Sequence, residues 1–365
     1  MKKFVSFISL VISVCCINWF CCESPQAWAA ENSSSSVSWK QCRNRPMDWY
    51  GSKEAVRIAD NLLLYQKHIG GWPKNIDMAQ VLTSQQKKKL VDSQSRKKEA
   101  TIDNSATYRQ LSYLAKVYQK TKVERFKQAC LKGCDFLIDI QYDNGGWPQF
   151  PYKRGYYSRI TFNDGAMIGV MNFLKDASND PLYDFVDQSR KKRAKQAVAK
   201  GIDCILRCQI VVDGKRLAWC AQHDENTQKP APARSYEKIS LSGSESVGVV
   251  RFLMGIDNPS DEIKESIKSA VEWFEAVKLT GIKEIRKPAS GTPKGYDKVI
   301  IQDDSAAPIW ARFYEIGTNQ PIFCGRDGII KYSVAEIEYE RRNGYSWYTG
   351  SPRDLSDDYS DWLKK

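Results

Sequence analysis

The chain has 365 residues, of which 42% are hydrophobic and 27% are charged. This composition excludes an intrinsically disordered or collagen-like chain, and the length allows either one large domain or two of ordinary size. The formal net charge of +12 favours an anionic partner. Judged from the charge alone, this partner is nucleic acid, an acidic membrane surface or an acidic polysaccharide.

The first 29 residues have the pattern of a secretory signal peptide. Lys2 and Lys3 precede an apolar run over residues 4–22, and Ala27-Trp28-Ala29 provides a cleavage site after Ala29. The alternative is an uncleaved anchor, because about 19 apolar residues can just span a bilayer. The small residues at the cleavage site favour a secreted or periplasmic protein with no membrane contact after cleavage.

Seven cysteines remain beyond the signal segment, an odd number, so at least one thiol stays unpaired or bridges two chains. They are Cys42, Cys130, Cys134, Cys204, Cys208, Cys220 and Cys324. Two pairs have the i,i+4 spacing of one helix face, whereas structural zinc sites usually use cysteines on loops. We expect small buried hydrophobic side chains; disulfides and a metal site are the alternatives.

Internal similarity is the strongest signal of organisation. Gly-Gly-Trp-Pro-Lys-Asn at 70–75 returns as Gly-Gly-Trp-Pro-Gln-Phe at 145–150, each time after a helical stretch that ends in Gln. A degenerate third copy surrounds Gln209 and Trp219. Each copy therefore predicts the end of a helix, a glycine turn and then a tryptophan.

A second signature follows each turn and opens another helix. Residues 101–106 are matched by residues 161–166, and more loosely by 241–245 and 302–306. The Asp, Asn and Ser residues in these segments are typical helix N-caps. Apolar periodicity predicts helices over 55–62, 108–118, 126–137, 168–174, 194–205, 247–254 and 263–274, and a last one through Trp310 and Phe313.

Helix pairs on a period of about 60 to 80 residues stack because one pair cannot bury its apolar face alone. We predict an all-α fold, an (α/α) toroid built from repeated helix pairs with long irregular loops. After a short segment at 30–44, residues 45–365 form one catalytic domain. In a toroid the second helices of the pairs start at one end, so Asp103 and Asp164 converge on one face.

This face carries carboxylates, with a third acidic group at Glu245 or at Asp303/Asp304. Carboxylate oxygens from separate segments suit Ca²⁺. The alternatives are a pair of catalytic carboxyls for glycoside hydrolysis and plain helix capping.

Arg234 and His223 lie in a segment without helical periodicity. The prolines of Pro230-Ala231-Pro232 impose an extended path that carries Arg234 to the same face. A Ser-His-Asp triad has little support because no Gly-x-Ser-x-Gly motif is present. A structural hydrogen-bonding role for His223 is therefore favoured.

Two further arginines, Arg312 and Arg326, lie near the fourth repeat. Arginine forks bind carboxylates, although surface arginines are common in a basic chain. No Walker loop, RNA-binding signature or zinc-finger spacing supports a nucleic-acid partner.

Six motifs in order resemble the polysaccharide lyase family 10 pectate lyases, over about residues 45–350. They are Gly-Gly-Trp-Pro-Lys-Asn at 70–75, Thr-Ile-Asp-Asn at 101–104, Gly-Gly-Trp-Pro-Gln at 145–149, Phe-Asn-Asp-Gly at 162–165, Gln-His-Asp at 222–224 and Pro-Ala-Arg-Ser-Tyr-Glu at 232–237. The resemblance implies an (α/α) toroid and a monomeric enzyme that cleaves polygalacturonate, or pectin, by Ca²⁺-assisted β-elimination.

The resemblance also implies roles for individual residues. Arg234 matches the catalytic base, and Asp103 and Asp164 match Ca²⁺-binding positions, with Asp103 also in the active centre. The substrate-binding residues implied are Arg312, Arg326, Asn104 and His223. Ser105 and Ser235 depart from the residues expected in the family, but neither departure removes a catalytic group.

An arginine base predicts an alkaline optimum, because guanidinium has a pKa above about 12 and needs help from burial and neighbouring cations. Two alternatives remain at this level. One is a glycoside hydrolase that uses the paired aspartates, and the other is a non-catalytic pectin-binding protein.

Overall fold

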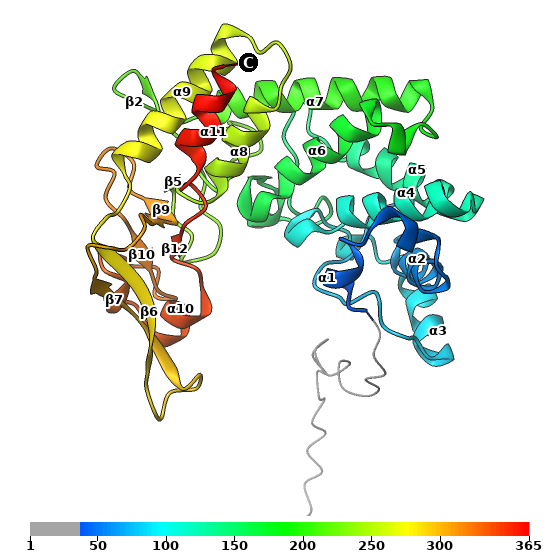
Figure 1. The fold of residues 1–365 in the computed structure, drawn as a ribbon, viewed down its shortest axis with the longest axis horizontal. Helices are drawn as coiled ribbons and strands as arrows, with labels where there is room; N and C mark the ends of the chain where they lie inside the picture. Colours follow the sequence, from blue (N-terminus) through cyan, green and yellow to red (C-terminus); the bar gives the residue numbers. More distant parts are fainter. Residues whose placement is uncertain (1–36, 365) are drawn as a thin grey trace, which may run out of the picture. The chain divides into compact units, whose positions relative to one another are not determined.

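Amphipathic helices are the main regular elements of residues 37–364, the part of the chain described in a computed structural model (Figure 1). The predicted signal peptide and its cleavage site lie outside these residues. The longer helices are α2 (Lys53–Tyr65), α3 (Ser84–Ser93), α4 (Tyr108–Thr121), α5 (Glu124–Asp139), α6 (Ala166–Asn179), α7 (Gln188–Cys208), α8 (Glu245–Met254) and α9 (Asp261–Ala276). The shorter ones are α1 (Trp39–Cys42), α10 (Tyr339–Gly344) and α11 (Leu355–Trp362).

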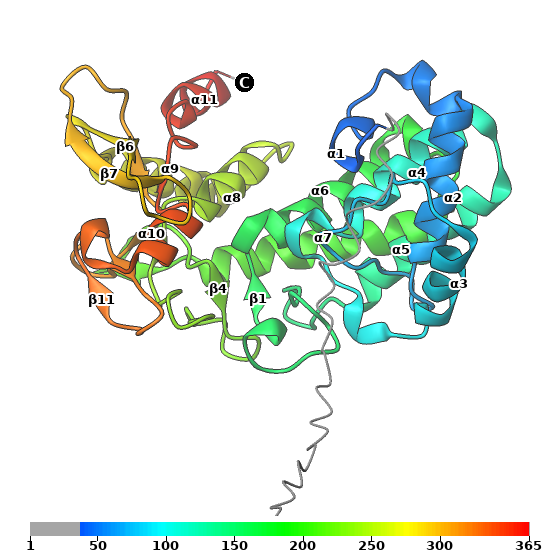
Figure 2. The ribbon, with the colours of Figure 1, turned by 90° about the horizontal axis from the view of Figure 1, so that it is seen from below.

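The helices pack in two rows. α4, α6 and α8 contact one another in sequence, and α2, α5, α7 and α9 form a second row beside them. Pairs that are consecutive in the chain, α4 with α5 and α6 with α7, join the rows (Figure 2). This arrangement confirms the predicted all-α fold of the (α/α) toroid type.

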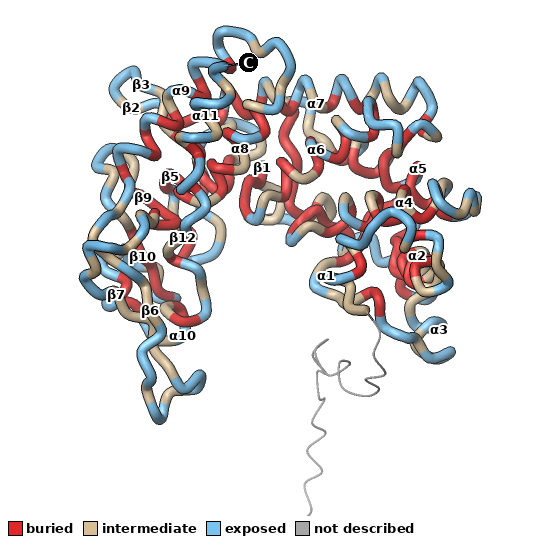
Figure 3. The backbone as a smooth tube through the Cα atoms, viewed as in Figure 1, coloured by how far each residue is buried: buried red, intermediate tan, exposed pale blue. Residues whose placement is uncertain are grey.

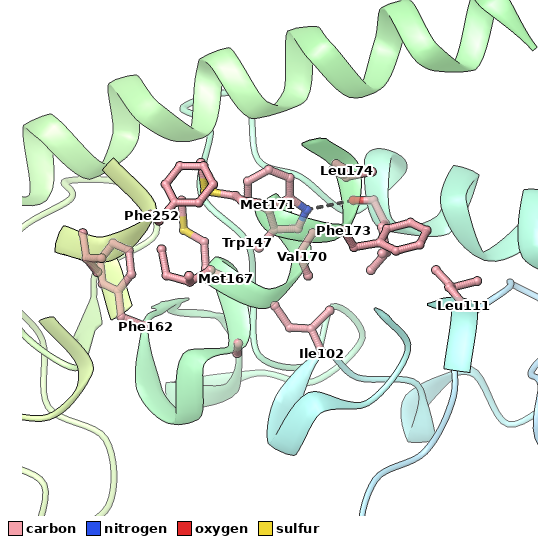
Figure 4. Packing of buried hydrophobic residues seen from close by; sticks show 14 of the residues in the cluster. Ile102, Leu111, Trp147, Phe162, Met167, Val170, Met171, Phe173, Leu174 and Phe252 are labelled. Carbon is pink, nitrogen blue, oxygen red and sulfur yellow. Dashed lines mark hydrogen bonds between the residues drawn. The ribbon is translucent and has the colours of Figure 1, made fainter. Parts of the chain in front are cut away.

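Buried residues of the helical region lie where the two rows meet, and a second buried cluster, which includes Phe313 and Trp347, lies among the C-terminal strands (Figure 3). In the middle of the helical region Met167 and Met171 of α6 pack with Trp147 and with Phe252 of α8 (Figure 4). Gly201 of α7 lies against this cluster, and a Cβ there would come within 2.7 Å of the Met171 Cε, so a larger residue would require the Met171 side chain to move.

The tryptophan of each repeat anchors its turn to the preceding helix. A fully buried indole Nε1 donates to a carbonyl near the end of that helix, 2.7–2.8 Å away. The four pairs are Trp72 with Leu62, Trp147 with Leu137, Trp219 with Ile205 and Trp310 with Phe274. The repeat in the sequence is thus a repeat of one hydrogen-bonded turn.

The glutamine that ends each helical stretch joins successive helices of one row. Gln66, Gln141 and Gln209 each use Nε2 to donate to one carbonyl of their own turn and to one in the next helix. Their partners in the next helix are Ala129, Ala197 and Ser266. Each amide therefore links its own turn to the interior of the next helix in the row.

The expected helix through Trp310 and Phe313 is wrong. Both residues lie in short strands, β8 and β9, which pair with β12 and β5 respectively. Pro308 lacks the N–H that a helix interior needs, and the aromatic residues that follow favour a pleated, half-buried surface. The fourth repeat keeps its tryptophan turn but has no second helix.

Strands are short except for one hairpin that the sequence analysis did not predict. β6 (Ile282–Pro288) and β7 (Tyr296–Gln302) pair antiparallel. The two-residue strands are β1 (Ile160–Thr161), β2 (Val211–Val212), β3 (Lys215–Arg216), β4 (Gln222–His223), β5 (Leu241–Ser242), β8 (Trp310–Ala311), β9 (Phe313–Tyr314), β10 (Phe323–Cys324), β11 (Ile330–Lys331) and β12 (Tyr348–Thr349).

All seven cysteines of the described region are buried free thiols, which confirms the expectation of small hydrophobic side chains. The Sγ atoms of Cys204 and Cys208 are 3.9 Å apart, too far for a disulfide. No group of three or more His, Cys, Asp or Glu residues in this region is arranged to hold a metal ion. Among the described helices, none has the length and apolar character to cross a bilayer.

Candidate active site

Two equivalent turns bring Asp103 and Asp164 to neighbouring positions. The turns, η4 (Asp103–Ser105) and η6 (Asn163–Gly165), contact each other and precede α4 and α6. In each, two consecutive residues have a positive φ, 49° and 65° at Asn104 and Ser105, and 52° and 65° at Asp164 and Gly165. Asn and Asp tolerate this left-handed conformation better than most residues do.

The prediction that these aspartates cap helices is wrong. No side-chain cap hydrogen bond is made at the start of α4, α6 or α8. By contrast, Ser52, Asp187 and Ser260 accept cap hydrogen bonds at the starts of α2, α7 and α9 in the other row. The carboxylates of η4 and η6 are therefore not used by their own helices.

Both aspartates line a cleft of about 200 Å³. Its other lining residues come from the repeat turns and from the segment between β4 and β5. They are Lys74, Asn104, Gln149, Phe150, Lys153, Tyr156, Tyr157, Asn163, Gln222, Arg234 and Glu237. The structure thus brings together four predicted site residues, Asp103, Asn104, Asp164 and Arg234.

Asp103 is buried and forms an ion pair with Lys74. Its Oδ1 also accepts a hydrogen bond of 2.9 Å from the backbone N–H of Asn104. Lys74 belongs to the first Gly-Gly-Trp-Pro turn, so the repeat itself places this ammonium group beside the carboxylate. A buried carboxylate needs such a partner to stay ionised.

Asp164 is more open, with 40% of its side chain exposed. The nearest cation is Arg312, whose NH2 is 3.6 Å from Oδ1. Arg312 is buried and also pairs with Glu245, which is therefore the third acidic group near this face. Burial raises the pKa of Asp164; Arg312 opposes this, and Glu245, Asp103 and Glu237 add to it.

Arg234 reaches the cleft from the irregular segment, as predicted, with 41% of its side chain exposed. Its Nε donates to Glu237 Oε2 at 2.8 Å, and its NH2 donates to Glu237 Oε1. The guanidinium is thus paired with a carboxylate, and Lys74 and Lys153 are the other cations of the cleft lining. The hydrogen bonds to Glu237 raise the pKa of Arg234, although burial opposes them.

Several predicted residues lie outside the cleft lining, including Arg312 and Glu245, which pair with each other beside Asp164. His223 is fully buried, and its Nδ1 lies 2.9 Å from the carbonyl oxygen of Gln228. This contact is the structural hydrogen bond that the sequence analysis favoured for His223. Arg326 forms a bidentate pair with Glu340 in a separate surface pocket. Asp303 pairs with Lys283 at 3.8 Å and is not among the acidic groups of the cleft.

Several cleft residues escaped the sequence analysis. Lys74 and Gln149 occupy the same position of the Gly-Gly-Trp-Pro repeat, so the repeat held a signal for both. Tyr156 and Tyr157 follow the second copy in a loop and carry no pattern that sets them apart. Glu237 lies three residues after Arg234, a spacing that suits an ion pair in a tight turn.

Paired helices on an (α/α) toroid, with a cleft of carboxylates, cations and tyrosines, define a carbohydrate-active enzyme. The family model described as pectic acid lyase matches residues 66–355. The chain therefore belongs to the pectic acid lyase family, and it is a polysaccharide lyase of family 10.

Solved structures support the same assignment. A family 10 polysaccharide lyase from Cellvibrio cellulosa is 32% identical, with a TM-score of 0.74 over 87% of this chain and 95% of that one. An aspartate-to-alanine mutant of such a lyase from the same organism, in complex with trigalacturonic acid, is 33% identical. Its TM-score is 0.73 over 86% of this chain and 95% of that one. No curated protein matches the chain.

Proposed function

We propose that the protein cleaves polygalacturonate by Ca²⁺-assisted β-elimination, with Arg234 as the Brønsted base. The observation that carries the proposal is the shared cleft: Arg234 lies in the same small cavity as Asp103 and Asp164. The trigalacturonic acid bound to the similar lyase supports an anionic uronate chain as the substrate.

The reaction suits the groups present. The C5 proton of a galacturonate is acidic because it lies α to a carboxylate. Arg234 in its neutral form takes this proton, the electron pair forms the C4–C5 double bond, and the C4–O bond to the neighbouring sugar breaks. The leaving oxygen takes a proton from water. Lys74 and Lys153 line the cleft beside the base, where their charges attract substrate carboxylates.

The donor set fits Ca²⁺. Asp103 and Asp164 offer hard oxygen ligands. Burial, and to a smaller extent the neighbouring carboxylates, raises the pKa of Asp164, and a bound cation would favour its charged form. When bound, Ca²⁺ supplies Lewis-acid stabilisation of the charge that develops on the substrate carboxylate. Asp103 and Asp164 would hold the ion.

Arg234 is a cation at neutral pH, as guanidinium groups are, and its hydrogen bonds to Glu237 raise its pKa further. As long as the pH is below this pKa, the neutral fraction of the side chain grows about tenfold with each unit of increasing pH, so activity should rise toward alkaline pH. This rise follows from the charge state of Arg234, not from the titration of a carboxylate.

A single assay tests these points: residues 30–365 with polygalacturonate, with Ca²⁺ or a chelator, at several pH values. We expect ultraviolet absorbance from the unsaturated product, an alkaline optimum and loss of activity with chelator. Reducing ends without absorbance would show hydrolysis, and binding without product would show a pectin-binding protein. An acidic optimum would assign the base to a carboxylate, and full activity in chelator would exclude the Ca²⁺ requirement.

We also propose export to the periplasm or the medium. The support is the signal-like pattern of residues 1–29. Expression of the full chain in a bacterial host should yield a mature form that begins at Ala30, as N-terminal sequencing would show. A mature form that retains Lys2 and Lys3 would contradict cleavage.

A further inference from the structure

We propose that a second pocket, beside the catalytic cleft, binds another uronate residue of the same polysaccharide chain. The pocket has a volume of about 300 Å³ and lies between α1 and the first Gly-Gly-Trp-Pro turn. Lys74 and Asn104 line both the pocket and the cleft, so the two cavities adjoin. The proposal rests on the proposed function, because it adds a binding site for the same polygalacturonate chain.

Two residues that line this pocket each hold a buried polar atom without a hydrogen-bond partner among residues 37–364. Gln110 is only 3% exposed, and its Oε1 accepts no hydrogen bond. The Nε of Arg43 is buried and donates none. The two side chains therefore keep unused hydrogen-bonding capacity beside the pocket, and a galacturonate residue offers the matching hydroxyl and carboxylate.

The charge of the pocket favours an anion. Lys40, Arg43 and Lys74 line it, against the single carboxylate of Asp77. The Oδ1 of Asp77 accepts hydrogen bonds from two backbone N–H groups, so this carboxylate is engaged with the fold. Burial and nearby Arg109 both lower the pKa of Arg43, and no carboxylate is among the groups that affect it.

Trp39 supplies an aromatic wall beside the guanidinium. Its ring lies 5.4 Å from the Tyr113 ring, and the Arg43 guanidinium lies 5.8 Å from its centroid. An indole next to a cation and an amide oxygen is a combination of apolar and polar groups that suits a sugar ring. α1 precedes residues 66–355, the range matched to the family, so this wall lies outside the family pattern.

The test compares Arg43→Met with wild type on trigalacturonate, octagalacturonate and polygalacturonate. Loss of one charge-assisted contact should raise KM by about tenfold for the long substrates. We expect less than about a twofold change for the trimer, with kcat unchanged, because the trimer need only fill the catalytic cleft. Arg43→Lys should recover part of the affinity, since it restores the charge.

Arg45→Met is the matched control, because Arg45 is exposed and does not line the pocket. It should leave every KM unchanged. Equal KM values for Arg43→Met and wild type on octagalacturonate, or an equal rise on the trimer, would overturn the proposal. If Arg43→Met does not fold, the same comparison with the exposed Lys40→Gln decides between the two results.

Failure of the proposed function gives a different result. A wild-type protein that binds octagalacturonate without cleaving it would contradict the lyase reaction alone, and the dissociation constants of the Arg43 variants would still decide the pocket. A wild-type protein that neither binds nor cleaves it would overturn both.

Discussion

Glu237 links the proposed base to the buried part of the site. Its carboxylate accepts two hydrogen bonds from the Arg234 guanidinium, one of 3.2 Å from the Arg234 backbone N–H and one of 2.8 Å from the hydroxyl of Tyr345. Arg312, the partner of Asp164, lies 4.6 Å from the centroid of the Tyr345 ring. The buried carboxylate of Glu237 therefore fixes the direction of the Arg234 side chain. It also stabilises the protonated form of Arg234, which must give up a proton before it can act as a base.

Glu237→Gln should lower kcat by about 10- to 100-fold, because a misplaced catalytic group is costly even when the shift is small. KM should change little, since the cationic side chains that attract the substrate remain. Steady-state kinetics on polygalacturonate across pH would measure the split, with the exposed Glu265→Gln as the control. An unchanged kcat would show that Arg234 does not depend on Glu237 for its orientation.

His223 makes stability depend on pH. Burial lowers its pKa from 6.5 to about 4, so the folded protein holds the imidazole neutral. Its contribution is present above pH 6.5 and is lost as the pH falls from 6.5 to about 4, because the unfolded chain then binds a proton that the folded chain does not. The difference between the two pKa values corresponds to about 3 kcal/mol in the free energy of unfolding.

Urea unfolding of wild type and His223→Gln at pH 7 and pH 5 would measure this contribution. The loss of stability on acidification should be smaller in the variant. His68→Gln is the control, because His68 is exposed and is the other of the two histidines. A wild type and a His223→Gln variant with the same pH dependence would contradict the prediction.

At the scale of elements, periodicity predicted most of what the structure contains. Each of the helices α2, α4, α5, α6, α7, α8 and α9 covers a segment in which apolar residues recur at helical spacing. The same rule failed after Pro308, where the residues pair with strands far away in the sequence, and it gave no sign of the hairpin β6–β7. Local spacing does not encode such long-range pairings.

The candidate site was predictable only in part, for a similar reason. The repeat placed Asp103 and Asp164 at equivalent turns, and the proline-rich segment carried Arg234 to them. The partners that set their charge, Lys74 and Glu237, depend on contacts that are formed only in the fold. The helix-capping interpretation failed because it assigned the carboxylates to their own helices.

The glutamines that join successive helices should be important for stability. In Gln209→Met the volume is nearly kept, but the carbonyl of Leu217 loses its donor, and the carbonyl of Ser266, inside α9, loses the donor from outside its own helix. Leaving the Leu217 acceptor unpaired and removing the link to α9 should cost about 1–3 kcal/mol. Chemical denaturation would measure this cost.

Gln128→Met serves as the control for Gln209→Met. Gln128 is exposed and bonds to Glu124 on the surface of its own helix, so its replacement should change stability by less than about 0.5 kcal/mol. Equal effects of the two substitutions would show that the link between α7 and α9 contributes nothing particular.

At the scale of the whole molecule, the positive charge belongs to the folded part of the chain. Removal of Lys2, Lys3 and Glu23 with the signal segment lowers the net charge by one unit, from +12 to +11. Cations line both the cleft and the adjoining pocket. The positive electrostatic field of the whole molecule and the cations of its two cavities therefore both favour binding of a polyanion.

Association with polygalacturonate should weaken as salt increases. The Debye length falls from about 14 Å at 0.05 M ionic strength to about 4 Å at 0.5 M, so the long-range attraction is largely screened. We expect kcat/KM for the polymer to fall several-fold over this range at constant Ca²⁺, while kcat at saturating substrate stays constant, because salt weakens encounter more than contacts already formed. Sucrose at equal osmolality should have no such effect, and a kcat/KM that is independent of NaCl would show that the net charge plays no part in substrate capture.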